Sequence, residues 1–175
     1  MISEAMQTAF ANCSAYYLDT TLSSRVLDMY RVGILFREPT FCDATYKFGG
    51  FAAHHRYLII SSNARSLDIF SQHPEWGLSV WAPGRIFKVL GKQQSAAYVQ
   101  ITLLEIPENM RAKFLQPHLN DLEKAFVYQA RQRFELAFQT PVLPEHQTHL
   151  WLDRLKSPVG IDDAGRFFES WSSGS

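Results

Sequence analysis

The sequence gathers several side chains that could bind an anion around one short apolar run, Arg56 to Ile60. The polar residues that flank this run are His54, Ser61, Ser62, Asn63 and Arg65. A helix that began directly after the run would point free backbone N–H groups and the positive end of its dipole at a bound anion. Arg65 could add a two-point contact to a phosphate or a carboxylate. The segment is the candidate ligand site, and His54 joins it only if the preceding chain folds back.

Helix capping gives a simpler explanation of the same residue types. Ser62 or Asn63 would satisfy the first N–H groups of a helix without any ligand. No glycine-rich loop precedes the segment, so it is neither a phosphate-binding loop nor a dinucleotide fingerprint. The patterns HExxH, CxxC, GxSxG and the EF-hand loop are also absent from the sequence. We therefore assign no catalytic residue and expect no cofactor.

Other histidines and acids have spacings that deserve comparison with metal sites. His54 and His55 are adjacent, so on an extended backbone they point to opposite sides and do not ligate one metal together. Glu145, His149 and Asp153 recur every four residues and would share one face of a helix. A helical metal site usually takes ligands from a second element as well, and none is identified. The sequence thus favours a solvent-facing stripe of charge pairs and predicts no metal site.

The elements that position these residues are predicted from hydrophobic periodicity. Between residues 41 and 106, β-branched and aromatic residues alternate with polar ones, as in half-buried strands. Arg56 to Ile60 is apolar on both faces and is expected to be a central strand. The expected strands cover 41–48, 56–60, 77–81, 85–90 and 97–106, with a short helix over 62–71. Short connections between the last three strands favour antiparallel pairing.

Helical periodicity dominates on both sides of this block. The expected helices cover 3–17, 20–38, 107–117, 120–138, 144–155 and 163–171. The longest has a capping-box pattern, Asn120 with Glu123, at its start. Helices, then strands, then helices are typical of the α+β class. We therefore expect an antiparallel sheet of about five strands, residues 41–106, packed by N-terminal and C-terminal helices mainly on one face.

Length and composition restrict the class further. The 175 residues suit one domain over 1–171, followed by a disordered tail at 172–175. Seventeen basic and 17 acidic residues give zero net charge, which argues against general nucleic-acid binding and against an anionic membrane surface. Apolar runs are too short to span a bilayer. Cys13 and Cys42 are expected to be free thiols in a cytoplasmic protein.

Two classes of function are compatible with these observations. Neutral charge, many aromatic residues and the lack of a strong catalytic pattern favour a soluble intracellular module that binds a protein partner or itself as a homo-oligomer. The alternative is a small enzyme or sensor that binds a phosphate- or carboxylate-bearing small molecule at the helix start around Ser62 to Arg65. A concave pocket lined by His54 or His55 with Ser62 and Arg65 would favour the alternative.

Overall fold

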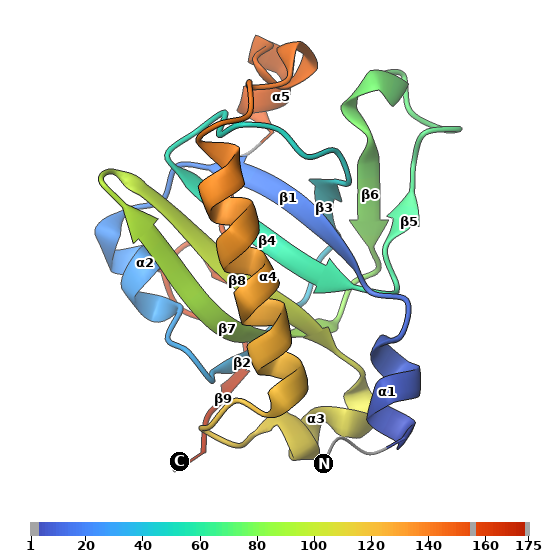
Figure 1. Cartoon of the computed structure of the whole chain (residues 1–175), viewed down its shortest axis with the longest axis vertical. Helices are drawn as coiled ribbons and strands as arrows, with labels where there is room; N and C mark the ends of the chain where they lie inside the picture. The colour runs from blue at the N-terminus through green and yellow to red at the C-terminus, as the bar shows by residue number, and fades with distance from the viewer. Residues whose placement is uncertain (1–3, 155–156, 174–175) are drawn as a thin grey trace.

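The computed structural model describes residues 4–154 and 157–173, and within them the chain forms a nine-stranded sheet (Figure 1). From one edge to the other, the strand order is β5 (Arg65–Ser66), β6 (Leu78–Trp81), β3 (Cys42–Thr45), β1 (Ser14–Thr20), β4 (His55–Ser61), β8 (Tyr98–Ile106), β7 (Arg85–Ser95), β2 (Leu35–Glu38) and β9 (Ser170–Trp171). The sheet is therefore wider than the expected five strands, and it draws strands from outside residues 41–106.

The sheet is mixed, not antiparallel, so the predicted sheet type is wrong. β4 and β8 are parallel, with His55 opposite Val99 and Ile60 opposite Leu104, whereas the other strand pairs are antiparallel. The sheet type depends on how strands far apart in the sequence pair with one another. β7 precedes β8 in sequence but lies beyond it in the sheet, and the β7–β8 hairpin brings the chain back to lie alongside β4 in the same direction.

Side chains of the central strand β4 pack into a core on each face of the sheet. Tyr57 and Ile59 belong to one buried cluster, and Leu58 and Ile60 belong to the other. This confirms that β4 is apolar on both faces, but it corrects the expectation that mainly one face is covered. The helices are α1 (Glu4–Phe10), α2 (Ser24–Met29), α3 (Arg111–Phe114), α4 (Asp121–Ala137) and α5 (His149–Asp153), with the 3-10 turns η1 (Pro74–Trp76), η2 (Glu108–Met110) and η3 (Pro144–His146).

The longest helix, α4, crosses one face of the sheet and covers β7 and β8 (Figure 1). Its predicted capping box is present. The Asn120 side chain accepts a hydrogen bond from the Glu123 backbone N–H at 2.9 Å, and the Glu123 carboxylate accepts one from the Asn120 N–H at 2.7 Å. Ala130 on the inner side of α4 is buried in the same core as Phe10 of α1 and Phe114 of α3.

Four of the expected helices are wrong or much shorter than predicted. α1 ends at Phe10, and the following residues form strand β1. The second expected helix, 20–38, is divided into α2 and strand β2. No helix occurs at 62–71, where β5 pairs with β6, nor at 163–171, where turns lead into β9. In each case pairing with a distant strand overrides local helical spacing.

Three smaller predictions have mixed outcomes. Cys13 and Cys42 are free thiols, as expected. Ser3, the predicted cap of the first helix, and residues 174–175 of the predicted tail lie outside the described residues. Across the described part of the chain, no helix combines the length and apolar character needed to cross a bilayer.

Candidate functional site

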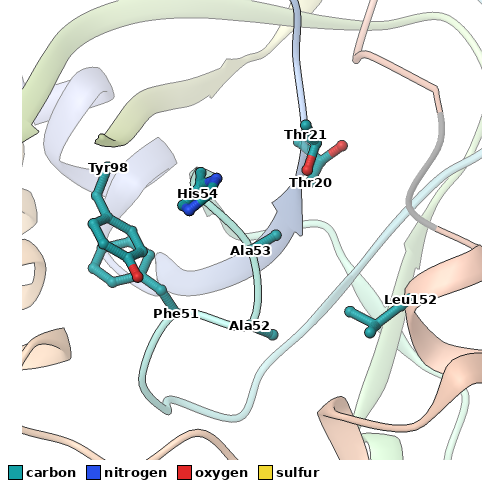
Figure 2. Close-up of a pocket in the computed structure, with 8 residues that line it drawn as sticks. All are labelled: Thr20, Thr21, Phe51, Ala52, Ala53, His54, Tyr98 and Leu152. Carbon is teal, nitrogen blue, oxygen red and sulfur yellow. The ribbon is translucent and has the colours of Figure 1, made fainter. Parts of the chain in front are cut away.

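A cavity opens where the end of β1 meets the loop before β4. Its volume is about 540 Å³, within the range usual for small-molecule sites. The lining residues are Thr20, Thr21, Phe51, Ala52, Ala53, His54, Tyr98 and Leu152. Figure 2 shows Phe51, His54 and Tyr98 together on one side, with the two threonines and Leu152 across from them. The cavity therefore has an aromatic wall and a wall that carries hydroxyl groups.

The aromatic wall is a packed group of rings. Phe51 and Tyr98 have ring centroids 5.0 Å apart, and the His54 ring meets Tyr98 edge-on at 5.3 Å. Phe134 and Phe138 of α4 pack behind them, with Phe51 at 5.6 and 5.1 Å from the two rings. Rings at these distances and tilts attract one another and hold one another in place. The wall thus presents a fixed apolar surface to which a flat ligand ring could pack.

A buried ion pair fixes the loop that carries Phe51. The Arg56 guanidinium is 2% exposed and donates to Asp19 through Nε at 2.5 Å and through Nη2 at 2.8 Å. It also donates to the carbonyl groups of Gly49 and Gly50, each at 3.0 Å. Arg56 lies under the ring of Phe51, with its Cζ 4.5 Å from the ring centroid. Because the guanidinium is engaged in these contacts, it supports the cavity wall and does not serve as a ligand contact.

The Asp19 carboxylate also holds the loop at Ala52, next to Phe51. Asp19 Oδ2 accepts a hydrogen bond from the Ala52 backbone N–H at 2.8 Å. On the other side, Gly50 N donates to the Pro141 carbonyl at 2.9 Å. A Cβ at Gly50 would lie 2.2 Å from the Thr140 carbonyl oxygen, so only glycine allows this close approach. The loop is consequently fixed at both of its faces.

His55 fixes the opposite wall. Its Nδ1 accepts a hydrogen bond from the Leu22 backbone N–H at 2.8 Å, so this nitrogen carries no proton. Burial, and secondarily the neighbouring His54, lower the pKa of the His55 ring, which keeps it neutral at pH 7. The neutral ring holds the chain just after Thr20 and Thr21, which is where the hydroxyl-bearing wall is formed.

The chemistry of the lining is limited to a few groups. His54 supplies the ring nitrogens of the lining. Among the described residues, no carboxylate and no thiol lines the cavity, and no group of three or more His, Cys, Asp or Glu is placed to hold a metal. The arrangement can bind a ring and can donate and accept hydrogen bonds.

The predicted site residues do not come together. Ser61 is buried at 1% exposure, where its hydroxyl contacts the Glu105 carboxylate and accepts from Trp81 Nε1 at 2.9 Å. It also accepts from the Asn63 N–H at 2.9 Å, so Ser61 stabilises the end of β4. His54 lies at the opposite end of β4. Of the five predicted residues, His54 alone lines the cavity.

Ser62, Asn63 and Arg65 occupy the turn into the edge strand β5. Ser62 is exposed, and Arg65 is exposed and pairs in register with Val80 of β6. The helix N-terminus on which the anion site depended is absent, because this segment is extended. Anion binding by these residues stays a prediction without that structural basis.

The residues that sequence reasoning missed are Asp19, Phe51 and Tyr98. The sequence contained a signal for the Asp19–Arg56 pair. Asp19 lies inside the run Ser14–Thr20, which contains two tyrosines, and Arg56 begins another apolar run. Charged residues inside buried strands are usually paired with each other. The aromatic wall had no comparable signal, since its rings come from a loop and the start of a distant strand.

No protein-family model matches the sequence, and no curated protein matches it. Among solved structures, the chain is similar to the type III effector XopAI from Xanthomonas axonopodis pv. citri, with 16% identity and a TM-score of 0.46 over 56% of this chain and 46% of that chain. It is similar to the ADP-ribosyltransferase HopU1 of Pseudomonas syringae pv. Tomato DC3000, with 16% identity and a TM-score of 0.47 over 54% and 45%. It is also similar to C3stau2 from S. aureus with NAD, with 12% identity and a TM-score of 0.44 over 61% and 74%.

The chain spans about half the length of the XopAI and HopU1 chains. HopU1 is an enzyme, and this finding contradicts the expected protein-protein interaction module.

Proposed function

We propose that the chain is a small enzyme or sensor that binds a phosphate- or carboxylate-bearing small molecule in the cavity between Thr20 and Tyr98. A flat ring of the ligand packs on Phe51 and Tyr98. The hydroxyl groups of Thr20 and Thr21 form hydrogen bonds with its polar substituents. His54 contacts its anionic group.

The main support for this proposal is that two separate sets of contacts hold the two walls of the cavity in place. The Asp19–Arg56 ion pair holds the loop of Phe51, and neutral His55 holds the chain after Thr20. A buried ion pair is weak evidence for stability alone, because desolvation offsets most of its attraction. Because the pair lies beneath a cavity wall, it also holds that wall in place. A wall that is already fixed loses less conformational entropy when a ligand binds.

The lining also indicates the ligand class. Arg56 already donates to Asp19, Gly49 and Gly50, so the cavity lacks a free guanidinium. The His54 ring is then the lining side chain whose nitrogens can hydrogen-bond to an anionic group of the ligand. A ligand with an uncharged ring and one anionic group fits this lining better than a polyanion.

The experiment is a thermal-shift screen followed by calorimetry with nucleotides, sugar phosphates, aromatic carboxylic acids and NAD, the compound in the C3stau2 structure. Tyr98→Ala should weaken any true ligand by roughly tenfold or more through loss of stacking. His54→Ala should weaken the anionic compounds more than uncharged compounds that carry the same ring.

Tyr128→Ala is the matched control, because Tyr128 is 64% exposed on α4 and lies outside the cavity lining. This variant should bind as the wild type does. Failure of every compound to bind the wild type, or equal binding by Tyr98→Ala and wild type, would contradict the proposal.

A further inference from the structure

A second cavity lies between the start of β1, the end of β4 and α4, away from the Thr20–Tyr98 cavity. Its volume is about 350 Å³. The lining residues are Cys13, Ser14, Ala15, Tyr17, Tyr46, Phe48, Ile60, Phe126, Gln129 and Arg133. Phe126, Gln129 and Arg133 follow one another on α4 at spacings of three and four, so they share one face of the helix. The two cavities have no lining residue in common.

Among the described residues of this lining, Arg133 carries the one charge, and none is an aspartate or a glutamate. Its Nη1 donates to the Tyr17 hydroxyl at 2.7 Å, and its Cζ lies 5.8 Å from the Phe48 ring centroid. Arg133 is exposed, and among the described residues it has no carboxylate partner and its Nε and Nη2 make no hydrogen bond to the protein. These two nitrogens form the paired donor geometry that matches a carboxylate.

The partner of Arg133 does not neutralise it. Burial raises the pKa of Tyr17, and the smaller opposing effects of Arg133 and Arg56 do not reverse this. The phenol is therefore neutral at physiological pH and acts as a hydrogen-bond acceptor that orients the guanidinium. Arginine held in place by a neutral group keeps its full charge for another partner.

The remaining walls favour a ring on that partner. Tyr46, Phe48 and Phe126 contribute aromatic surface, while Ser14 and Gln129 contribute polar groups. Two acids contact residues at or beside this lining: Asp68 accepts from the Tyr46 hydroxyl at 2.8 Å, and Glu105 contacts Ser61. An anionic ligand would meet the Arg133 guanidinium beside the aromatic side chains.

We propose that this cavity is a binding site for an aromatic carboxylate. The two carboxylate oxygens accept from Nε and Nη2 of Arg133, and the ring packs among Tyr46, Phe48 and Phe126. The Tyr17 hydroxyl holds the guanidinium in the orientation that this contact requires. The site does not depend on the proposed function of the Thr20–Tyr98 cavity, because different residues form it.

The test measures benzoate binding to the full chain by calorimetry, and by proton–nitrogen NMR shifts of the residues around the site. Arg133→Gln should weaken benzoate binding by about ten- to a hundredfold, which corresponds to loss of one charge-assisted pair. Tyr17→Phe should weaken it less, because the charge remains but is no longer oriented. Arg131→Gln is the matched control: it removes the same charge from the same helix but lies outside this lining.

Three comparison ligands separate the contributions. Inorganic phosphate reports anion attraction without a ring, and benzamide reports the ring without a charge, so each should bind at least about tenfold more weakly than benzoate. Nicotinate reports whether a ring nitrogen is tolerated, and it should bind within about tenfold of benzoate. Thermal unfolding of each variant verifies that the fold is retained.

The proposal is overturned if benzoate does not bind the wild type, if Arg131→Gln and Arg133→Gln lose equal affinity, or if phosphate binds as tightly as benzoate. The last result would indicate a general anion site. Benzoate also belongs to the ligand class proposed for the Thr20–Tyr98 cavity, so the NMR shifts assign its binding to a site. Shifts around Arg133 that are lost in Arg133→Gln and kept in Tyr98→Ala belong to this cavity, so failure here and failure at the Thr20–Tyr98 cavity are distinguishable.

Discussion

Asp19 and Arg56 face each other in register on the paired strands β1 and β4, and their side chains form a buried two-point ion pair. The pair joins the sheet to the loop that carries the aromatic wall. Strand pairing therefore positions the cavity directly, because the same register that aligns β1 with β4 places the carboxylate under Ala52 and the guanidinium under Phe51.

Breaking this pair should be strongly destabilising. Arg56→Met leaves Asp19 as a buried charge that keeps the hydrogen bond from the Ala52 N–H but loses its cation, and we expect a loss of about 3–5 kcal/mol in the free energy of unfolding. Denaturant titration measures this loss. Lys124→Gln is the control, since the Lys124–Asp121 pair is exposed and should contribute less than about 1 kcal/mol. Equal losses in the two variants would show that the buried pair has no special role.

Gly50 tests the fixed loop without removing a polar contact. In Gly50→Ala the new methyl group would meet the Thr140 carbonyl oxygen at 2.2 Å, so the loop or the residues after α4 must move. We expect a loss of about 1–3 kcal/mol and weaker ligand binding in the Thr20–Tyr98 cavity. Gly91→Ala is the comparison, because its closest contact is the movable Gln93 amide at 3.1 Å. A neutral Gly50→Ala variant would mean that the close approach is not required.

These loop contacts illustrate what the sequence could and could not predict. Local patterns correctly predicted the capping box of α4, the fully buried strand β4 and the strand β6, since each depends on a few neighbouring residues. Helical spacing of Phe10, Cys13 and Tyr17 misled the prediction at the N-terminus. The competing signal was the aromatic and β-branched content of Ser14–Thr20, and pairing on both sides with β3 and β4 determined the outcome.

Less of the candidate site than of the fold could be predicted from the sequence. Its lining comes from the end of β1, the loop before β4, the start of β8 and α5, so it depends on the parallel pairing of β4 with β8. That pairing places Val99 opposite His55 and brings Tyr98 against His54. No local pattern specifies which strand becomes the neighbour of another, and His54 alone was predicted because its residue type stood out.

The free energy of unfolding should decrease as the pH is lowered below 7, because of His55. Burial lowers the folded pKa of His55 from 6.5, and its Nδ1 must stay unprotonated to accept from Leu22. The unfolded chain therefore binds a proton as the pH falls through about 6.5, while the folded chain does not, so stability is present above this pH and is lost below it. Denaturant titrations at pH 8, 7, 6 and 5 measure the slope.

The matched variant for this prediction is His55→Asn, which keeps an acceptor near the Leu22 N–H but cannot titrate. Its stability should decline less between pH 7 and pH 5 than that of the wild type, whatever its stability at pH 8. Parallel declines in the two proteins would assign the pH dependence to other groups. His146 is one such group, since burial also lowers its pKa.

Glu123 has two roles, and two substitutions should separate them. Its carboxylate caps the Asn120 N–H and also pairs with Lys88 at 2.6 Å, where Lys88 is 0% and Glu123 1% exposed. Glu123→Gln keeps a cap acceptor but leaves Lys88 as a buried cation, and we expect a loss of about 3–5 kcal/mol in the free energy of unfolding. Asn120→Ala removes the cap and leaves the ion pair, so it should lose only about 1 kcal/mol. Denaturant titration of both variants decides between the roles. Similar losses of stability would mean that Glu123 matters for capping alone. The buried Lys88 ammonium would then be stabilised by the Gln116 carbonyl at 3.3 Å and by the Phe114 ring.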